Sequence, residues 1–289
     1  MVTLNSRFAN LLPYAFLRGT ACQIKLAQPA GVIVPASGVP GWILSNWKPG
    51  WLARLLKKLV PREPGLFVDV GANVGQTMLS YKFSGGIDYL GIEPNPTCVG
   101  FLDRVIEISG LSNYRVVPTG LSDENKFTRL YLHDSTDTAA TMLKDLRLAV
   151  GKHEQIVSVV QLDSLLGDLS FGDVGIIKID VEGYELEALR GMRRTLSKDA
   201  PIIVCEVLGT AIGKPLEPKK FRNAGIMQML AELDYEVHSL RKNSDGNTIS
   251  TELIQEFPDV YWSEEAREEF DYIFLPKCKA KRIKLIQSP

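Results

Sequence analysis

Short β-branched runs alternate with longer amphipathic runs along most of the chain, from residue 66 onward. Strands that are followed by helical crossovers predict a mostly parallel sheet with helices on both faces, which is an α/β fold. The last two apolar runs suit an antiparallel pair at an edge. The expected strands are 66–70, 89–93, 114–118, 174–180, 201–207, 235–240 and 271–275, and the expected helices are 51–59, 76–83, 97–108, 185–196 and 226–233.

Composition narrows the class of protein without identifying a ligand. The chain has 289 residues, of which 45% are hydrophobic, so it can bury a sizeable core. Its 33 Lys and Arg residues balance 34 Asp and Glu residues, so no net field favours nucleic acid as a partner. Cys22, Cys98, Cys205 and Cys278 form no CxxC pair, which argues against a zinc site and a disulfide framework. We therefore expect a reducing compartment, the cytoplasm.

The two ends of the chain differ from the regular middle. An apolar stretch at 8–17 is too short to cross a bilayer and lacks the features of a signal peptide, so no membrane span is expected. Residues 1–60 are rich in proline and carry Trp42 and Trp47, and this extension is expected to pack on the main domain or on a partner, where it is a candidate homo-oligomer interface. Residues 61–276 form the expected domain. The basic tail, 277–289, is expected to be a solvated end.

The stretch FVDVGANVGQT, residues 67–77, predicts a strand, a sharp turn and the start of a helix. Gly71 and Gly75 allow the turn and the close approach of a ligand, although a purely structural turn has the same pattern. Asn73 stands where a dinucleotide-binding loop carries its second glycine, which disfavours NAD. Asp69 supplies a carboxylate that suits a ligand with a positive amino group.

Glu93 ends the second strand, 22 residues after Gly71. An acid at this distance accepts hydrogen bonds from the hydroxyls of a ribose. NAD would use the same acid, so Glu93 indicates a ribose without choosing between nucleoside cofactors. Glu93 could instead cap the helix that follows Pro96, and this alternative stays open.

A charged stripe lies in the apolar segment IIKIDVEGYELEALRG, residues 176–191. In an extended strand Lys178, Asp180 and Glu182 point to one face, because side chains alternate. Unpaired charges in the centre of a sheet cost several kcal/mol each. The stripe is therefore either a structural network of ion pairs or the wall of a ligand cleft.

Five segments in this order and spacing resemble the FkbM family of S-adenosylmethionine-dependent methyltransferases. The resemblance covers residues 65–209, about half of the chain, and implies a class I methyltransferase (Rossmann-like) fold. In that fold the mostly parallel sheet has seven strands, the last of them antiparallel, with helices on both faces, and here it carries an N-terminal extension. The segments are VDVGANVGQT, GIEPNP, GLSDE, VVQLDSLL and IKIDVEGYELEALRG.

The resemblance also implies S-adenosylmethionine as the cofactor. The turn around Asp69 would hold its methionine end, Glu93 its ribose, and Ser122 with Asp123 would lie near its adenine, unless these last two form an ordinary polar turn. Asp180 would face the sulfonium. The candidate cofactor-binding residues are Asp69, Gly71, Ala72, Asn73, Gly75, Gln76, Glu93, Pro94, Asn95, Ser122, Asp123 and Asp180.

The implied reaction is methyl transfer to a small-molecule acceptor, for this family commonly an oxygen of a saccharide or a secondary metabolite. A hydroxyl acceptor needs a base, and Asp180 is the first candidate and Glu182 the second. Lys178 would lower their pKa or stabilise an alkoxide. Glu206 either lines the acceptor side or satisfies a nearby group, and no metal is predicted.

Two other functions are compatible with parts of the pattern. An NAD-dependent oxidoreductase would use the same turn and Glu93, but Asn73 and the charged stripe argue against it. A non-catalytic cofactor-binding protein on the same scaffold would keep the binding residues without turnover. The acceptor is not identified by the sequence, because its specificity is expected from residues 133–151, residues 214–225 and the N-terminal extension.

Overall fold

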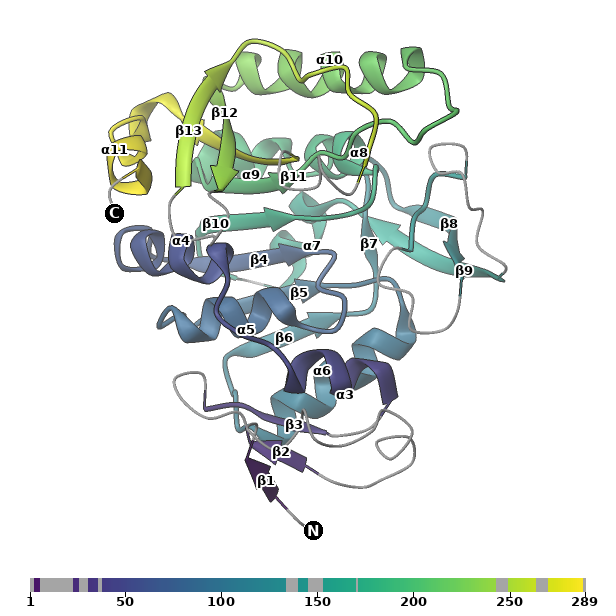
Figure 1. Ribbon diagram of the computed structural model, residues 1–289, viewed down its shortest axis with the longest axis vertical. Helices are drawn as coiled ribbons and strands as arrows, with labels where there is room; N and C mark the ends of the chain where they lie inside the picture. The colour runs from purple at the N-terminus through teal and green to yellow at the C-terminus, as the bar shows by residue number, and fades with distance from the viewer. Residues whose placement is uncertain are drawn as a thin grey trace.

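A mixed sheet of eight strands forms the centre of the computed structural model (Figure 1), in the order β13-β12-β14-β11-β10-β4-β5-β6. The structure describes residues 3–5, 23–25, 31–35, 38–133, 140–144, 153–169, 171–242, 249–263 and 270–287. The strands of this sheet are β4 (Leu66–Val70), β5 (Tyr89–Ile92), β6 (Tyr114–Val117), β10 (Val174–Ile179), β11 (Ile202–Glu206), β12 (Tyr235–Lys242), β13 (Ile249–Ile254) and β14 (Asp271–Pro276).

The sheet confirms the expected mostly parallel topology and corrects it in two details. Strands β6, β5, β4, β10 and β11 run parallel, whereas β14 is antiparallel to both β11 and β12. The predicted antiparallel pair exists, but β14 lies inside the sheet and all six of its residues are buried. The prediction of seven strands was wrong by one. β13 adds an edge strand, and its sequence ISTELI lacks the apolar run that marked the others.

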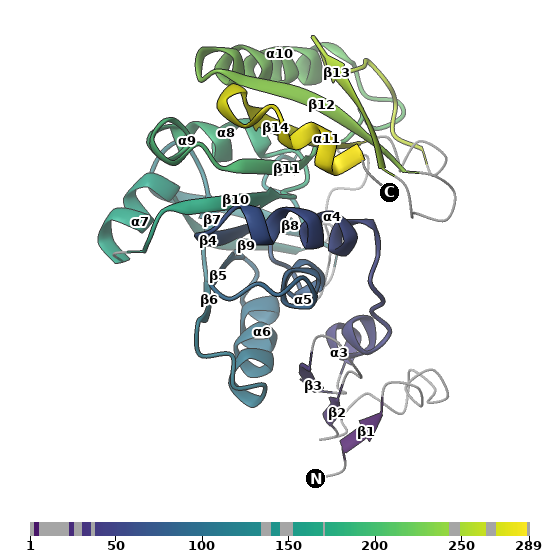
Figure 2. The same ribbon diagram turned by 90° about the vertical axis from the view of Figure 1, so that its left-hand side faces the viewer.

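Helices cover both faces of the sheet, as Figure 2 shows edge-on. On one face α3 (Gly38–Ser45), α4 (Trp51–Leu59), α5 (Gln76–Phe83), α6 (Pro96–Ile108) and α11 (Arg282–Gln287) contribute to a first apolar core. On the other face α7 (Leu162–Leu169), α8 (Glu185–Arg190), α9 (Arg193–Asp199) and α10 (Glu217–Glu232) build a second one. Central strands such as β4 are buried along their whole length because both faces are covered.

Two smaller sheets flank this centre. The short strands β1 (Thr3–Asn5), β2 (Gln23–Lys25) and β3 (Ile33–Pro35) form one at the N-terminus. β7 (Gly120–Leu121), β9 (His153–Val160) and β8 (Lys126–Leu132) form the other, beside the carboxyl ends of the parallel strands (Figure 1). The hydrophobic pattern did not predict β8 and β9, since they leave Phe127 and Ile156 exposed.

Two helices differ from their predicted bounds for local reasons. The predicted helix 185–196 is divided into α8 and α9 around Gly191. A Cβ atom at Gly191 would lie 1.9 Å from the Ser122 carbonyl oxygen, so the backbones touch at this break. α10 begins at Glu217 rather than at residue 226, because its first half is polar and carries no apolar signal.

The extension and the tail both contact the domain. The rings of Trp47 and Phe83 pack edge to face with centroids 6.0 Å apart, and the Lys242 ammonium lies 4.7 Å from the centre of the Trp51 ring. The tail was expected to be a solvated end, but it packs on the domain. Arg282 Nε donates to Glu63 Oε1 at 2.6 Å, and Ile286 is buried. The division into extension, domain and tail stays a prediction.

Two features near the start of the sequence, the apolar stretch 8–17 and Cys22, lie outside the described residues. Among the helices that the structure describes, none is long and apolar enough to span a membrane. The other three cysteines are free thiols, of which Cys98 and Cys205 are buried.

Candidate functional site

A pocket opens where the parallel strands β4, β5 and β10 end, which is the edge at which open α/β sheets bind ligands. Its floor comes from the ends of these strands, and one side comes from the small sheet of β7 and β8. The lining residues are Val70, Gly71, Asn73, Ile92, Glu93, Pro94, Gly120, Leu121, Leu130, Ala140, Met142, Asp180, Val181 and Glu182.

The turn after β4 is sharp, as predicted, but its glycines pack against protein. Gly71 has φ +83°, and a Cβ atom there would lie 1.9 Å from the Asp180 carbonyl oxygen. Gly75 has φ +100°, and its Cβ position faces Leu102 at 2.7 Å. Gly71 therefore lets this turn meet the turn after β10, and Gly75 lets it approach α6. The space beside these two Cα atoms is filled by protein and is not available to a ligand.

The backbone amides of this turn are used within the fold. Gly71 and Ala72 both donate to the Ile92 carbonyl, at 2.9 and 3.1 Å, and Gly75 donates to the Ala72 carbonyl at 2.9 Å. The Asn73 amide donates to Glu93 Oε2 at 2.8 Å. A pyrophosphate needs such amides turned toward it. This turn instead directs them to protein oxygens.

Glu93 forms part of the pocket wall and is fixed by backbone donors. Its Oε2 accepts from Asn73 and its Oε1 accepts from the Asn95 amide, each at 2.8 Å. Burial raises the pKa of Glu93 to about 7, against the lowering effect of these two hydrogen bonds. Each carboxylate oxygen has a second lone pair. The ionised group could therefore accept two further hydrogen bonds, the number that a ribose offers through its two hydroxyls.

Asp69 lies behind the wall rather than in it. Its side chain is fully buried, and Oδ2 accepts a hydrogen bond of 2.6 Å from the Tyr89 hydroxyl. Burial raises its pKa to about 7, although Tyr89 and Lys178 lower it. Its Oδ1 has no hydrogen-bond partner among the described residues. A buried acceptor without a donor is unfavourable, so Oδ1 fits a ligand or water that brings a donor.

The other predicted residues of this turn and of the next have structural contacts. Pro94 lines the pocket. Asn95 is buried and caps α6 by accepting from the Thr97 amide at 3.0 Å. Ala72 is buried, and Gln76 is exposed at the start of α5. Neither of these two is among the lining residues.

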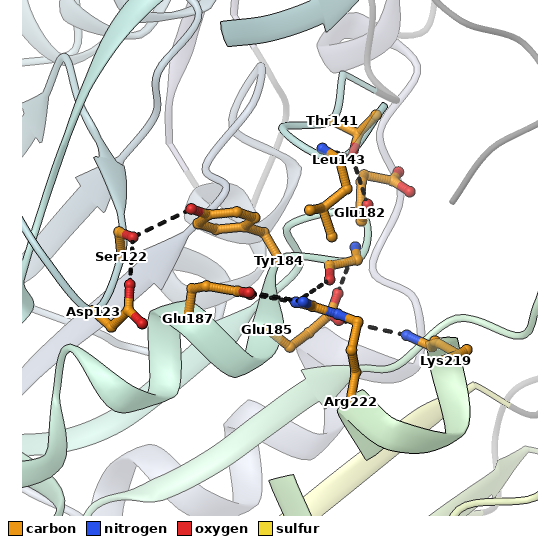
Figure 3. Close-up of polar contacts among 11 residues, drawn as sticks. Ser122, Asp123, Thr141, Leu143, Glu182, Tyr184, Glu185, Glu187, Lys219 and Arg222 are labelled. Carbon is orange, nitrogen blue, oxygen red and sulfur yellow. Dashed lines mark hydrogen bonds and ion pairs between the residues drawn. The ribbon is translucent and has the colours of Figure 1, made fainter. Parts of the chain in front are cut away.

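Ser122 and Asp123 lie next to the wall at the end of β7. The Ser122 hydroxyl is fully buried, donates to Asp123 Oδ1 at 3.1 Å, and lies 3.3 Å from the Tyr184 hydroxyl, as Figure 3 shows. The pocket itself is lined by the two preceding residues, Gly120 and Leu121. The structure therefore brings the predicted pair close to the pocket without exposing it there.

Lys178 and Asp180 lie on one face, as the alternation predicted. Their Nζ and Oδ2 atoms are 3.4 Å apart, and the Lys178 side chain is 5% exposed against 40% for Asp180. Burial alone would lower the pKa of Lys178, but the carboxylates of Asp180, Asp271 and Glu206 outweigh it and raise that pKa. Lys178 is therefore a buried cation beneath Asp180, and only Asp180 reaches the pocket.

Glu182 reaches the pocket by a different route from the one predicted. β10 ends at Ile179, so the strand alternation does not extend to Glu182. Instead Glu182 has φ +54° in the turn that follows. Asn73, with φ +48°, also lines the pocket, so two of the four described non-glycine residues with positive φ lie here. Backbone strain of this kind is concentrated at functional sites.

Glu206 interacts with nearby protein groups, which is one of the two alternatives that the sequence left open. It ends β11 directly opposite Asp271 of β14, and its carboxyl is hydrogen-bonded to Asp180. Burial, followed by the charge of Asp180 and this bond, raises the pKa of Glu206 to about 9. Asp271 in turn pairs with Lys242 at 2.6 Å. Glu206 therefore lies beside the proposed base but is not among the lining residues.

The sequence did not identify the apolar side of the pocket. Leu130 of β8, Ala140, Met142 and Val181 line it. Leu130, Ala140 and Met142 carry no motif and lie in or after β8, which was not predicted, whereas Val181 lies in the charged segment 176–191. Within the segment 133–151 that was expected to select the acceptor, residues 134–139 and 145–151 lie outside the described residues. In the described ranges no group of three His, Cys, Asp or Glu side chains could hold a metal ion.

Several known proteins are similar to this chain. "Methyltransferase 1" of Beauveria bassiana (strain ARSEF 2860) is 26% identical over an alignment of 147 residues that covers 45% of this chain and 59% of that relative, so the chain spans about three fifths of the relative's length. The crystal structure of Methyltransferase FkbM from Methylobacillus flagellatus KT is 18% identical, with a TM-score of 0.45, covering 81% of this chain and 50% of that one.

A second solved structure is more distant. Precorrin-6y C5,15-methyltransferase from Geobacter metallireducens GS-15 is 13% identical, with a TM-score of 0.39, covering 77% of this chain and 85% of that one. The model of the methyltransferase FkbM domain matches residues 69–237, which is more than half of the chain and includes every element around the pocket except residues 66–68 of β4. The chain belongs to the FkbM methyltransferase family.

Proposed function

We propose that the protein is an S-adenosylmethionine-dependent O-methyltransferase that acts on a hydroxyl of a small-molecule acceptor, such as a saccharide or a secondary metabolite. The observation that carries this proposal is the chemistry of the pocket wall. Three of the lining residues are acidic, Glu93, Asp180 and Glu182, and they lie at the ends of β5 and β10 among lining residues that are mainly apolar. Such a wall suits a nucleoside with a sulfonium group and an acceptor that loses a proton.

The residues present fit this cofactor. Glu93 would accept hydrogen bonds from the ribose hydroxyls, and the buried Asp69 Oδ1 would receive a donor from the methionine end, directly or through a water. Gly120 and Leu121 would contact the adenine side. Bound S-adenosylmethionine supplies an activated methyl group, so the protein has only to align the acceptor, exclude water and remove a proton.

Asp180 is the proposed base. It is a partly exposed carboxylate of the pocket, and Lys178 beneath it stabilises its ionised form. Glu206, whose pKa is raised to about 9, carries a proton at neutral pH and can donate to Asp180. Asp180 would accept the proton of the acceptor hydroxyl while its oxygen bonds to the methyl carbon and the sulfur–methyl bond breaks, with S-adenosylhomocysteine as the leaving group. Glu182 remains the second candidate for this role.

The hydrogen bonds of the first turn argue against an NAD-dependent oxidoreductase. The amides of Gly71, Ala72, Asn73 and Gly75 bind protein oxygens, whereas a pyrophosphate would need donors at this position. S-adenosylmethionine has no phosphate and does not need them. Calorimetric titration with S-adenosylhomocysteine and, separately, with NADH distinguishes the two readings, since only the first ligand should bind.

A non-catalytic binding protein would bind the cofactor equally well. Transfer of a tritiated methyl group from S-adenosylmethionine to the small molecules of a cell extract tests turnover. We expect more tritium in these small molecules than in a sample without enzyme, and we expect Asp180→Asn to lose this transfer. Binding of S-adenosylhomocysteine without any transfer of label would favour the binding protein.

A further inference from the structure

The turn between β10 and α8 forms one edge of the pocket through Val181 and Glu182. Its backbone is left-handed at two successive residues, with φ +54° at Glu182 and +106° at Gly183. Glutamate disfavours this conformation, so neighbouring groups must hold the turn in place. The family motifs explain the residues of the turn itself but do not indicate what holds it.

Side chains bind the backbone of this turn at several points, and Figure 3 shows Thr141, Glu185 and Arg222 gathered around it. The Gly183 amide donates to Glu185 Oε1 at 2.7 Å, and the Gly183 carbonyl accepts from Arg222 Nη2 at 2.9 Å. The preceding carbonyl, that of Glu182, accepts from the Thr141 hydroxyl at 2.8 Å. Both ends of the strained segment are therefore tied to groups outside it.

Two cations of α10 complete this arrangement. The Arg222 guanidinium forms a fork on the Glu187 carboxylate, in which Nη1 donates to Oε1 at 2.7 Å and Nη2 donates to Oε2. The Lys219 ammonium lies 3.7 Å from Glu185 Oε2, and both of these side chains are buried. Buried charges are retained where each has a partner. Here the partners are the two carboxylates in the first turn of α8, directly after the turn.

We propose that Arg222 and Lys219 of α10 are positioning residues of the cofactor pocket, which act through Gly183 and Glu185 to hold Glu182 at the pocket edge. The inference rests on the proposed function of the pocket. Neither cation is among the lining residues, so their effect on a ligand would be indirect. Arg222 is the stronger of the two, because it contacts the turn backbone itself.

Substitution of Arg222 tests this role, with Arg193 as the matched control. Like Arg222, Arg193 of α9 links two helices through an acid, since it binds Glu232 of α10 at 2.8 Å, but it forms no hydrogen bond to the turn among the described residues. In Arg222→Met we expect affinity for S-adenosylhomocysteine, measured by calorimetry, to fall about tenfold, as for the loss of a charge-assisted hydrogen bond. Hydrogen exchange of the Gly183 amide, followed by mass spectrometry, should accelerate. Arg193→Met should change neither quantity.

Arg222→Lys sharpens the comparison and replaces Arg222→Met if that variant does not fold. A lysine keeps the charge beside Glu187 but cannot bind the carboxylate as a fork and the Gly183 carbonyl together, so we expect an intermediate loss of affinity. Unchanged affinity in an Arg222 variant whose Gly183 amide exchanges faster would overturn the inference. Unchanged exchange of the Gly183 amide in an Arg222 variant would also overturn the inference. If the wild-type protein does not bind S-adenosylhomocysteine, that result counts against the proposed function, and the exchange measurement still tests the role of Arg222.

Discussion

The two turns that form the pocket are built in opposite ways. The turn after β4 is satisfied locally, since its amides bind Ile92 and Glu93 of the adjacent strand end. The turn after β10 is held by side chains from distant elements, Thr141 and Arg222. The first turn can therefore form as soon as β4 and β5 pair. The second depends on the packing of α10 and of the segment after β8.

One side of the pocket is therefore held by local contacts and the other by distant groups. The local turn binds Glu93, the proposed ribose ligand, through the Asn73 amide. The second turn carries Asp180 and Glu182, which face the proposed site of chemistry. Its supports, Thr141 and Arg222, come from outside both turns. Glu182 is therefore held by contacts that the first turn does not use.

The two turns meet at Gly71, and a substitution there should have the largest effect. In Gly71→Ala the new methyl group would collide with the Asp180 carbonyl oxygen, 1.9 Å away, at φ +83°. We expect a loss of more than about 3 kcal/mol in the free energy of unfolding, measured by urea denaturation.

Gly85→Ala is the control for this loss. Gly85 has a similar φ of +86° but no atom within 4 Å of its Cβ position. It should therefore lose only about 1 kcal/mol, from backbone strain alone. Equal losses in the two variants would contradict the close contact between the turns.

The second turn should govern transfer more than binding. In Asp180→Asn we expect the rate of labelled methyl transfer to fall by about 10²–10⁴-fold, as for loss of a general base. Affinity for S-adenosylhomocysteine should stay within about threefold, since the amide keeps the size of the carboxylate. Asp173→Asn, an exposed carboxylate beside Lys198, is the control and should retain full activity. Wild-type turnover in Asp180→Asn would remove Asp180 from the mechanism.

Glu93, which the first turn binds, should govern the affinity for the cofactor. In Glu93→Gln a side-chain amide would face one of the two backbone donors that now bind the carboxylate. We expect affinity for S-adenosylhomocysteine to fall by at least about tenfold, because charge-assisted hydrogen bonds are lost and one donor is left unpaired. Calorimetry measures this change, and thermal unfolding checks that the fold is intact. An unaltered affinity would show that Glu93 only supports the turn.

The remaining prediction is a pH dependence of stability. The pKa of Glu93 is about 7 in the folded protein against an ordinary value of 4.5, so the folded state holds this proton more tightly than the unfolded state does. Its contribution is present below pH 4.5 and is lost as pH rises to about 7. The free energy of unfolding of the wild type, relative to Glu93→Gln, should fall by up to about 1.4 kcal/mol per pH unit in this window. A rise in the same window would contradict the raised pKa.

The sequence predicted those parts of the fold in which local pattern and burial agree. β4, α4 and α5 have the predicted bounds, because each is a buried or amphipathic run that ends at glycine, proline or a polar turn. β8, β9 and β13 escaped prediction, since they are exposed on one side and lack a continuous apolar run. The first half of α10 escaped for a similar reason.

The site was predicted where it depends on strand ends and missed where it depends on distant contacts. Strand alternation placed Lys178 and Asp180 correctly, and the spacing placed Glu93 in the pocket wall. No local pattern could show that Asp69 is buried against Tyr89, or that Arg222 binds the Gly183 carbonyl 39 residues away. These contacts arise only when the strands and helices pack.

Calorimetric titration of the wild-type protein with S-adenosylhomocysteine, beside an identical titration with NADH, is the most direct test of the proposed cofactor. We expect saturable binding of S-adenosylhomocysteine at one site, lost or weakened in Glu93→Gln, and no binding of NADH. Binding of NADH with no response to S-adenosylhomocysteine would contradict it.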